Sequence, residues 1–311
     1  MPDPIRTAVI GIGHLGRHHA RIVAGLDGAR LTAVVDTIEE RAAAAAAATG
    51  ARAFSDYRAI VGEVDAVTIA VPTELHHQVA LPFLERGTAV LVEKPMARTL
   101  MEADELVAAA RASGATLAVG HTERYNPAVA TVLPLVTSPR FIEVHRLGAF
   151  PERSLDIDVV FDLMIHDLDI ILALVKSEVT SIEAVGVPVL TPKYDIANAR
   201  LRFASGCIAN VTSSRISKDR VRKIRFFQPD AYLSIDYAAQ EVEGWRLVHG
   251  EGPRPSIEGG PIPVARDEPL RLELADFIRA ARERTTPVVD GDAGRRALAL
   301  ATRVAEKMES V

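Results

Sequence analysis

Residues 5–16 read IRTAVIGIGHLG, a short apolar strand followed by three glycines in the spacing GxGxxG and the start of a helical pattern. A glycine at the first position allows a tight turn, the second lets the backbone approach a pyrophosphate, and the third lets the helix pack closely on the strand. The helix N-terminus that follows would face phosphate groups. This stretch therefore predicts a dinucleotide-binding loop formed by Gly11, Gly13, His14, Leu15 and Gly16.

Asp36 ends the second predicted strand, twenty residues beyond Gly16. A carboxylate at this place accepts hydrogen bonds from both hydroxyls of an adenosine ribose and repels a 2'-phosphate. The alternative is a structural aspartate, because Asp is common at strand ends. The spacing favours NAD over NADP as the cofactor.

The first 120 residues alternate short apolar runs with longer helical patterns, as a parallel sheet with crossover helices requires. The apolar runs are continuous rather than alternating, which is typical of strands covered on both faces. The predicted strands are Ile5–Ile10, Leu31–Val35, Arg52–Phe54, Ala66–Val71, Ala89–Val92 and Ala115–Val119, with helices over 14–26, 38–49, 74–86 and 99–113. Residues 1–120 are predicted to form an α/β Rossmann domain with a doubly wound parallel sheet.

The pattern changes after Gly120, where helices are followed by a series of strands. Helices are predicted over 126–136 and 160–175, and strands over 141–147, 179–189, 195–203, 207–214, 222–228 and 231–237. The segment 250–263 is rich in Gly and Pro and is predicted to be a loop, before two closing helices over 268–284 and 292–309. Residues 121–311 are thus predicted to form an α+β domain with an antiparallel sheet.

The composition places limits on the partners of the chain. The 311 residues include 48% apolar and 25% charged residues, with a net charge of −5. No run of Lys or Arg provides the electrostatic footprint that nucleic acid or an anionic membrane needs, so neither is an expected partner. The N-terminus lacks the pattern of a signal peptide, and no apolar segment is long enough to span a bilayer. We expect a cytoplasmic protein.

Cysteine and histidine spacings argue against a metal centre. Cys207 is the only cysteine, which excludes an intrachain disulfide and a thiolate cluster, and we interpret it as an inert strand residue. His14 and His18 have the i, i+4 spacing of a metal-binding pair, but the sequence places no third ligand near them. These two histidines and His19 are interpreted as surface or phosphate-proximal residues, and no metal site is predicted.

Four further segments carry a resemblance to a known family. They are VPTELH at 71–76, VEKP at 92–95, GHTERYNP at 120–127 and DLMIHD at 162–167. Together they resemble the Gfo/Idh/MocA family of sugar and inositol dehydrogenases. The resemblance implies an NAD-binding Rossmann domain followed by a substrate domain with a large, open, mainly antiparallel sheet. It also implies that the exposed face of this sheet builds a homodimer or homotetramer, and we expect the last helix to pack back near the boundary between the domains.

Lys94 is the candidate base for an oxidation that sends a hydride to NAD. It follows a buried strand at the carboxyl edge of the sheet, where Rossmann folds bind ligands. Partial desolvation and the positive nicotinamide would both favour its neutral form, whereas Glu93 would favour the charged form. Glu93 is therefore expected to orient the site or the cofactor. By resemblance, cofactor contacts also come from Pro72, Thr73, His76 and Arg124.

Asp162 and His166 are four residues apart and would share one face of a helix, with Asp169 a further turn away. His166 could bond a substrate hydroxyl and share its proton with Lys94, while Asp162 could hold the ring or a neighbouring hydroxyl. A structural histidine is the alternative. Lys94, His166 and Asp162 are the predicted catalytic residues.

The substrate domain most resembles the nucleotide-sugar branch of the family, which oxidises C3 of UDP-N-acetylglucosamine or its uronic acid. Besides the three catalytic candidates, substrate contacts are predicted from Tyr125, Asn126 and Arg153, with Lys193 and Tyr194 as further candidates for a UDP group. The alternatives are an inositol or free-sugar dehydrogenase and a non-catalytic NAD-binding regulator. A regulator would be expected to lack Lys94 and His166, which are both present. A protein-binding or nucleic-acid-binding module is disfavoured because it would have no use for a phosphate-binding loop.

Overall fold

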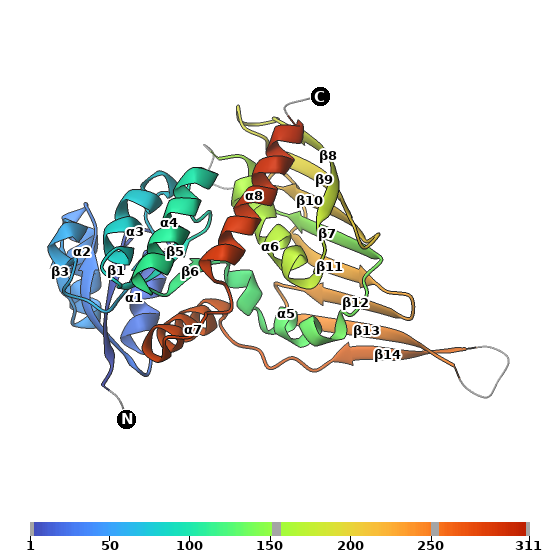
Figure 1. Cartoon of the computed structure of the whole chain (residues 1–311). Coiled ribbons are helices and arrows are strands. Elements are labelled where there is room, and N and C mark those ends of the chain that lie inside the picture. The colour runs from blue at the N-terminus through green and yellow to red at the C-terminus, as the bar shows by residue number, and fades with distance from the viewer. Residues whose placement is uncertain (1–2, 151–156, 250–254, 309–311) are drawn as a thin grey trace. The chain divides into compact units, whose positions relative to one another are not determined.

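The computed structural model describes residues 3–150, 157–249 and 255–308, and the chain forms two compact units (Figure 1). The first unit comprises residues 1–122 and 268–298, and the second comprises residues 123–267 and 299–311. The chain therefore enters the second unit after residue 122, returns to the first at residue 268 and leaves it again after residue 298. Each unit is made of segments that are far apart in the sequence.

The first unit contains a six-stranded parallel sheet in the order β3-β2-β1-β4-β5-β6. Every residue of β4 and β5 is buried, because helices cover both faces of the sheet. This arrangement confirms the predicted Rossmann-type sheet. The strands are β1 (Ile5–Ile10), β2 (Ala29–Val35), β3 (Arg52–Phe54), β4 (Ala66–Ile69), β5 (Ala89–Glu93) and β6 (Leu117–Gly120).

The helices of the first unit come from both ends of the chain. Leu274, Phe277 and Ile278 on α7 (Pro269–Glu283) belong to the same buried apolar cluster as residues of the sheet and of α1 (Gly16–Ala24). Burial of this amphipathic face explains why a C-terminal helix is part of the N-terminal unit. The other helices are α2 (Glu39–Thr49), α3 (His76–Leu84) and α4 (Leu100–Ser113), with short 3-10 turns η1 (Tyr57–Ile60) and η2 (Thr73–Leu75). Helix α8 (Gly291–Met308) begins in this unit and ends in the second.

The second unit contains an eight-stranded sheet among its described residues, in the order β14-β13-β12-β11-β7-β10-β9-β8. All neighbouring strands are antiparallel except β7 and β10, which are parallel, so the expected large and mainly antiparallel sheet is confirmed. The strands are β7 (Phe141–Leu147), β8 (Val179–Val187), β9 (Ile196–Phe203), β10 (Ile208–Ser214), β11 (Val221–Phe227), β12 (Ala231–Asp236), β13 (Glu241–Val248) and β14 (Ser256–Ile262).

The prediction of a loop over 250–263 is wrong for the residues that the structure describes there. Residues 256–262 form β14, which pairs with β13, a strand that the sequence pattern also missed. The glycines have a packing reason, because a Cβ at Gly259 would lie 2.0 Å from the carbonyl oxygen of Gly244. Pro261 is tolerated because β14 lies at the edge of the sheet. Gly and Pro here mark an edge strand with close backbone contact.

Alternating burial along β7 shows how the sheet is covered. Ile142, Val144 and Arg146 are buried, whereas the residues between them are half-exposed. Helix α5 (Pro127–Val132) packs on β12 and β13, and the π-helical turn η5 (Val160–Met164) packs on β10. The remaining elements are the 3-10 turns η3 (Thr122–Tyr125) and η4 (Leu133–Leu135) and helix α6 (Ile165–Leu174). Among the described residues, no helix combines the length and apolar character needed to cross a bilayer.

Candidate active site

The glycine loop between β1 and α1 has the shape that the sequence predicts. Gly11 has a φ of 85°, and a Cβ at Gly16 would lie 1.6 Å from the Gly11 carbonyl oxygen, so neither position accepts a side chain. A Cβ at Gly13 would meet no atom within 4 Å, which leaves open space above the loop. His14 and Leu15 are exposed beside it. This open cradle at a helix N-terminus fits the pyrophosphate of a dinucleotide.

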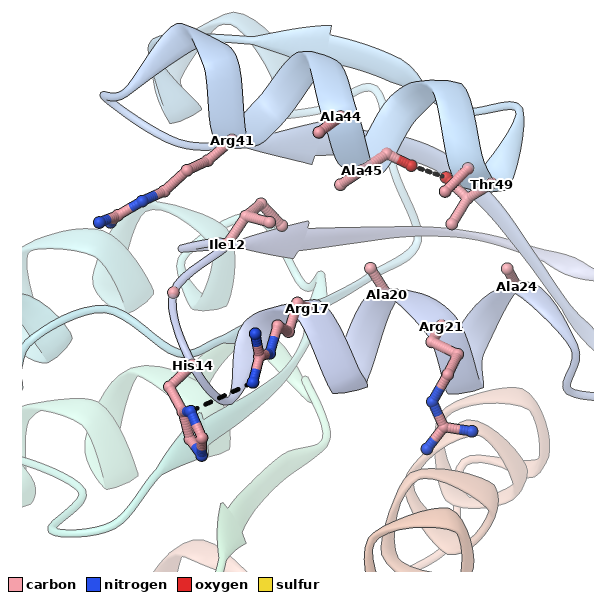
Figure 2. Close-up of a pocket in the computed structure, with 12 residues that line it drawn as sticks. Ile12, His14, Arg17, Ala20, Arg21, Ala24, Arg41, Ala44, Ala45 and Thr49 are labelled. Carbon is pink, nitrogen blue, oxygen red and sulfur yellow. Dashed lines mark hydrogen bonds between the residues drawn. The ribbon is translucent and has the colours of Figure 1, made fainter.

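A pocket of about 680 Å³ lies beside this loop, between α1 and α2. Figure 2 shows Ile12, His14 and Arg17 on the loop and α1 side, with Arg41 and a row of alanines on α2. Arg17 is joined to the ring of His14 by a hydrogen bond of 3.4 Å. The arginines give this side of the glycine loop a positive charge, which suits an anionic ligand.

Asp36 lies next to the glycine loop, at the carboxyl end of β2, and its side chain is 8% exposed. The backbone N–H of Ile12 donates to Oδ2 at 2.7 Å, and the N–H of Ile38 donates to Oδ1 at 2.8 Å. Each carboxylate oxygen has a second lone pair, so these bonds leave acceptors for the hydroxyls of a ribose. Asp36 therefore links the backbone at Ile12 to the backbone at Ile38. Its carboxylate still has acceptors for ribose hydroxyls, as its predicted role requires.

The loop after β4 carries three of the predicted cofactor residues, and they differ in exposure. Pro72 is exposed and Thr73 is half-exposed, whereas His76 is 1% exposed. The Nδ1 atom of His76 lies 2.8 Å from the carbonyl oxygen of Pro95, and its Nε2 atom lies 2.9 Å from that of Val71. Burial lowers the pKa of His76, and the charge of Lys94 adds to the lowering, whereas the two carbonyls and Glu93 oppose it.

Lys94 follows β5 at the carboxyl edge of the sheet and is half-buried. Directly before it, Glu93 is 6% exposed, and its Oε1 lies 3.0 Å from Nε2 of the buried His19 on α1. A Cβ at Gly120 would lie 2.9 Å from the Glu93 carboxylate, so the neighbouring strand needs a glycine. Burial acts to raise the pKa of Glu93, but the bond to His19 and the charges of His19, Lys94 and His76 outweigh it and lower this pKa. A buried carboxylate therefore lies beneath the candidate base.

Glu273 on α7 brings a second carboxyl group into the same network. Its side chain is 1% exposed. Burial raises its pKa well above the usual range, and the charge of Glu93 raises it further, while a hydrogen bond with Thr122 acts in the opposite direction. The two buried carboxyl groups thus have pKa values shifted in opposite directions, lowered on Glu93 and raised on Glu273.

The second unit presents Asp162 and His166 from one continuous helical segment. Asp162 lies in the π-helical turn η5 and His166 in the first turn of α6. Both are half-exposed, whereas Met164, Ile165 and Asp167 around them are buried. The π turn was not expected, since the spacing was interpreted as an ordinary α-helix. Such turns inside helices often occur at functional sites.

The third acidic residue of this segment, Asp169, does not join them. It is 2% exposed, and its carboxylate accepts a hydrogen bond of 3.3 Å from Arg124. Asp169 therefore differs from Asp162 and His166, because it is buried and they are half-exposed. Burial against Arg124 makes Asp169 part of the anchoring of α6.

Buried ion pairs hold α6 on the sheet directly below His166. The guanidinium of Arg146 on β7 donates to both oxygens of Asp167, at 2.6 and 2.9 Å, and to Glu123 at 3.0 Å. It also lies over the ring of Tyr237, 5.1 Å from the centroid. A bidentate contact fixes direction as well as distance. Asp167 directly follows His166, so its bidentate contact with Arg146 fixes the orientation of the helix turn that carries His166.

The segment after β6 is mostly built into the second unit. Tyr125 is 8% exposed and Asn126 is 2% exposed. The Asn126 side chain accepts from the Ala128 N–H, which caps α5, and donates to the carbonyl oxygen of Tyr237 at 3.0 Å. The structure thus explains Asn126 as a helix cap, and substrate contacts by Tyr125 and Asn126 stay predictions.

The candidates for a UDP group are less well defined. Arg153 lies outside the described residues. Lys193 is exposed, whereas the ring of Tyr194 packs against Gly186 of β8 and its N–H donates to Asp158 at 2.9 Å. The same loop is fastened by the buried Asp195, which accepts from three consecutive backbone N–H groups and from Arg215.

Several buried polar residues of these networks were not singled out from the sequence. The sequence does contain a signal for the burial of Glu273. This acidic residue lies on the apolar face of an amphipathic helix, four residues before Phe277. The interpretation of His19 as a surface or phosphate-proximal residue is wrong, because it occupies a similar inward position on α1 and is buried against Glu93. Arg146 in β7 and Arg215 directly after β10 had no comparable signal, because a single basic residue in or beside a strand is usually solvated. The described residues contain no group of three His, Cys, Asp or Glu side chains arranged to hold a metal ion.

Comparisons with known proteins agree with this geometry. Residues 5–121 match the model of the Gfo/Idh/MocA oxidoreductase family with an NAD-binding Rossmann fold, and residues 141–229 match the C-terminal domain of the same family. A UDP-N-acetylglucosamine 3-dehydrogenase from Acidithiobacillus ferrooxidans is 39% identical over 98% of both chains. A solved structure of that enzyme superposes with a TM-score of 0.92 over 98% of both chains, at 38% identity.

A second group of relatives acts on inositol. The scyllo-inositol 2-dehydrogenase (NAD+) of Bacillus subtilis is 30% identical, with 93% of this chain and 90% of that protein covered. The two family domains occur in the expected order, and they contain the glycine loop, Lys94 and the segment of Asp162 and His166. The chain is a member of the Gfo/Idh/MocA family of oxidoreductases and binds NAD through its Rossmann domain.

Proposed function

We propose that this protein oxidises a secondary hydroxyl of a sugar, C3 of UDP-N-acetylglucosamine or of its uronic acid, to the 3-keto sugar. The observation that carries the proposal is the similarity to a UDP-N-acetylglucosamine 3-dehydrogenase over 98% of both chains. This relative matches across both units, whereas a shared Rossmann domain alone would give no information on the substrate.

The reaction requires a proton and a hydride to leave the same alcohol. Bound NAD+ supplies the acceptor for the hydride from C3. In the proposal, the neutral amine of Lys94 takes the hydroxyl proton as the carbonyl bond forms. His166 donates or accepts a hydrogen bond at the same oxygen, and Asp162 holds the sugar through a neighbouring hydroxyl.

The surroundings of Lys94 support this role. Its side chain starts at the carboxyl edge of a parallel sheet, where the glycine loop and Asp36 also lie. The ionised carboxylate of Glu93 lies below the lysine, and the backbone N–H of Lys94 donates to it at 3.3 Å. These contacts hold the Lys94 backbone, and Lys94 as a whole is half-buried.

The first experiment follows nicotinamide reduction by absorbance. The protein is saturated with NAD and mixed in turn with UDP-N-acetylglucosamine, its uronic acid, myo-inositol and glucose. Reduction with a UDP-sugar alone is the expected result, and reduction only with myo-inositol or glucose would contradict it. Lys94→Met should lower turnover by about 10²–10⁴-fold while NAD binding is retained, because a general base contributes a factor of this size to such a rate.

An inositol dehydrogenase is the second candidate, favoured by the relative from Bacillus subtilis that matches across 93% of this chain. A non-catalytic NAD-binding regulator is the third. It would bind NAD tightly and reduce it with none of the four substrates. The retention of both Lys94 and His166 argues against the regulator.

We infer that the half-exposed face of the second unit's sheet joins copies of this chain into a dimer or tetramer. Phe141, Phe227 and Tyr232 form an aromatic cluster on this face, with ring centroids 5.6 and 5.2 Å apart. Phe227 is 37% exposed, and a second copy would bury it. Light scattering should show an oligomer that Phe227→Asp dissociates, and a monomeric wild-type protein would contradict the inference. The cytoplasmic location stays a prediction.

A further inference from the structure

His76 joins two loops of the first unit that lie side by side. It is the first residue of α3, and its ring points into the protein rather than to solvent. Its Nδ1 is 2.8 Å from the Pro95 carbonyl oxygen and its Nε2 is 2.9 Å from the Val71 carbonyl oxygen. Each ring nitrogen therefore faces a backbone carbonyl oxygen, and the neutral ring donates one hydrogen bond, to Pro95 in the Nδ1–H tautomer or to Val71 in the Nε2–H tautomer.

The two carbonyls belong to chain segments that follow neighbouring strands. Val71 comes two residues after β4, and Pro95 comes two residues after β5. These strands are parallel and adjacent, with Ile69 opposite Val92. A rigid ring between them fixes the distance between the two loops. Lys94 lies between the end of β5 and the carbonyl that the ring holds.

We propose that His76 is a positioning residue for Lys94, which it holds through the carbonyl of Pro95. The proposal rests on the base role of Lys94 proposed above. It replaces the expectation that the side chain of His76 contacts the cofactor. The backbone at Pro95 is anchored by His76 of α3, so the amine of Lys94 is aimed by contacts on both sides: Glu93 before it and His76 after it.

The next residue, His77, provides a matched control. It lies on the same helix and is partly exposed, and its Nε2 is 2.7 Å from Oε2 of Glu105 on α4. Substitution of either histidine removes the same number of atoms from the same turn. Only the His76 ring reaches the loop of Lys94.

Three variants at position 76 separate the contact with Pro95 from the contact with Val71. Ala removes both contacts, Asn places its amide nitrogen near Nδ1 as a donor to Pro95, and Gln places it near Nε2 as a donor to Val71. We expect His76→Ala to lower kcat by roughly 10–100-fold, because small misplacements of a reacting group have effects of this size. The Kd for NAD should change less than about threefold. His76→Asn should recover most of the loss, His76→Gln little of it, and His77→Ala should match the wild type within about twofold.

A second readout does not depend on the substrate. Acetic anhydride labelling followed by peptide mass spectrometry gives the reactivity of Lys94 as a function of pH, with the exposed Lys193 as the internal reference. The pH profile of Lys94 labelling should differ between wild type and His76→Ala, and His76→Asn should restore it.

Three outcomes would overturn the proposal. One is wild-type kcat and unchanged Lys94 labelling in His76→Ala. Another is an equal loss in His77→Ala. The third is loss of NAD binding and of thermal stability in all the His76 variants alike, which would show that the ring supports the fold of the whole unit. If no sugar reduces NAD in the wild type, the proposed function fails, but the labelling still decides the role of His76.

Discussion

The unit that carries Lys94 and the unit that carries His166 both contain buried charged networks, but of different composition. The network near Lys94 consists of histidines and glutamates: His19, His76, Glu93 and Glu273. The network below His166 consists of Arg146 with the carboxylates of Asp167 and Glu123. Arginine keeps its charge at all ordinary pH values, whereas His and Glu do not. Removal of the cation should therefore affect the second unit most, whereas carboxyl groups with shifted pKa values, Asp195 in the second unit and Glu273 in the first, give each unit its own pH response.

The largest expected effect follows from Arg146→Met. This change leaves the buried carboxylate of Asp167 and the partly buried carboxylate of Glu123 without their cation, which costs about 3–5 kcal/mol of unfolding free energy. Urea unfolding followed by the fluorescence of Trp245 measures it, because this only tryptophan of the chain lies on β13 of the second unit. The control is Arg266→Met, whose pair with Glu241 is largely exposed, and it should change stability by less than about 1 kcal/mol. An equal loss of unfolding free energy in both variants would contradict the expectation that the buried ion pair stabilises the protein more than the surface pair.

Asp195→Asn should have the next largest effect, and it is pH-dependent. Burial acts to raise the pKa of Asp195, but hydrogen bonds from the N–H groups of residues 189–191 and from Arg215 outweigh it and lower this pKa. A lowered carboxyl pKa adds stability that is present above the unfolded value of about 4 and is lost as the pH falls through the folded value. The variant should thus be about 2–4 kcal/mol less stable at pH 7. The difference should shrink in acid, and a constant difference would contradict the charge as its cause.

Glu273→Gln should act in the opposite direction in the first unit. The raised pKa of Glu273 gives stability that is present below the unfolded value of about 4.5 and is lost as the pH rises toward the folded value. A neutral glutamine avoids this loss, so the variant should be more stable than the wild type at pH 7 by about 1–2 kcal/mol, with little difference near pH 4. Calorimetry measures this on the transition that NAD shifts upward. Destabilisation at pH 7 would indicate that the carboxyl group itself is needed.

The smallest expected effect concerns the labelling of Cys207. Its labelling rate compares how readily the second unit opens in the different variants. Its thiol is 1% exposed, and burial raises its pKa to about 11. Iodoacetamide at mildly alkaline pH should therefore label it only when the second unit opens. Arg146→Met should accelerate labelling, whereas Glu273→Gln should leave the rate unchanged. Rapid labelling of the native wild type would contradict the inert role expected from the sequence.

The parts of the site that the sequence predicted are formed by residues that lie close together along the chain. The glycine loop was predicted because the turn, the close approach and the helix start all lie within residues 11–16. The parallel sheet followed from continuous apolar runs, and Lys94 from its place after one of them. The strands β13 and β14 were missed because Gly244, Gly259 and Pro261 signal loops unless the neighbouring backbone is known.

The sequence alone determined the family, the Rossmann sheet, the glycine loop and the segment of Asp162 and His166, because each is specified by neighbouring residues and their spacing. Only the tertiary structure decided what the buried polar groups contact. His19 meets Glu93 from another element, Arg146 meets Asp167 across the sheet, and His76 faces two backbone carbonyls that carry no side-chain signal. A hydrogen bond between distant segments depends on how the chain packs, and packing is a property of the whole unit.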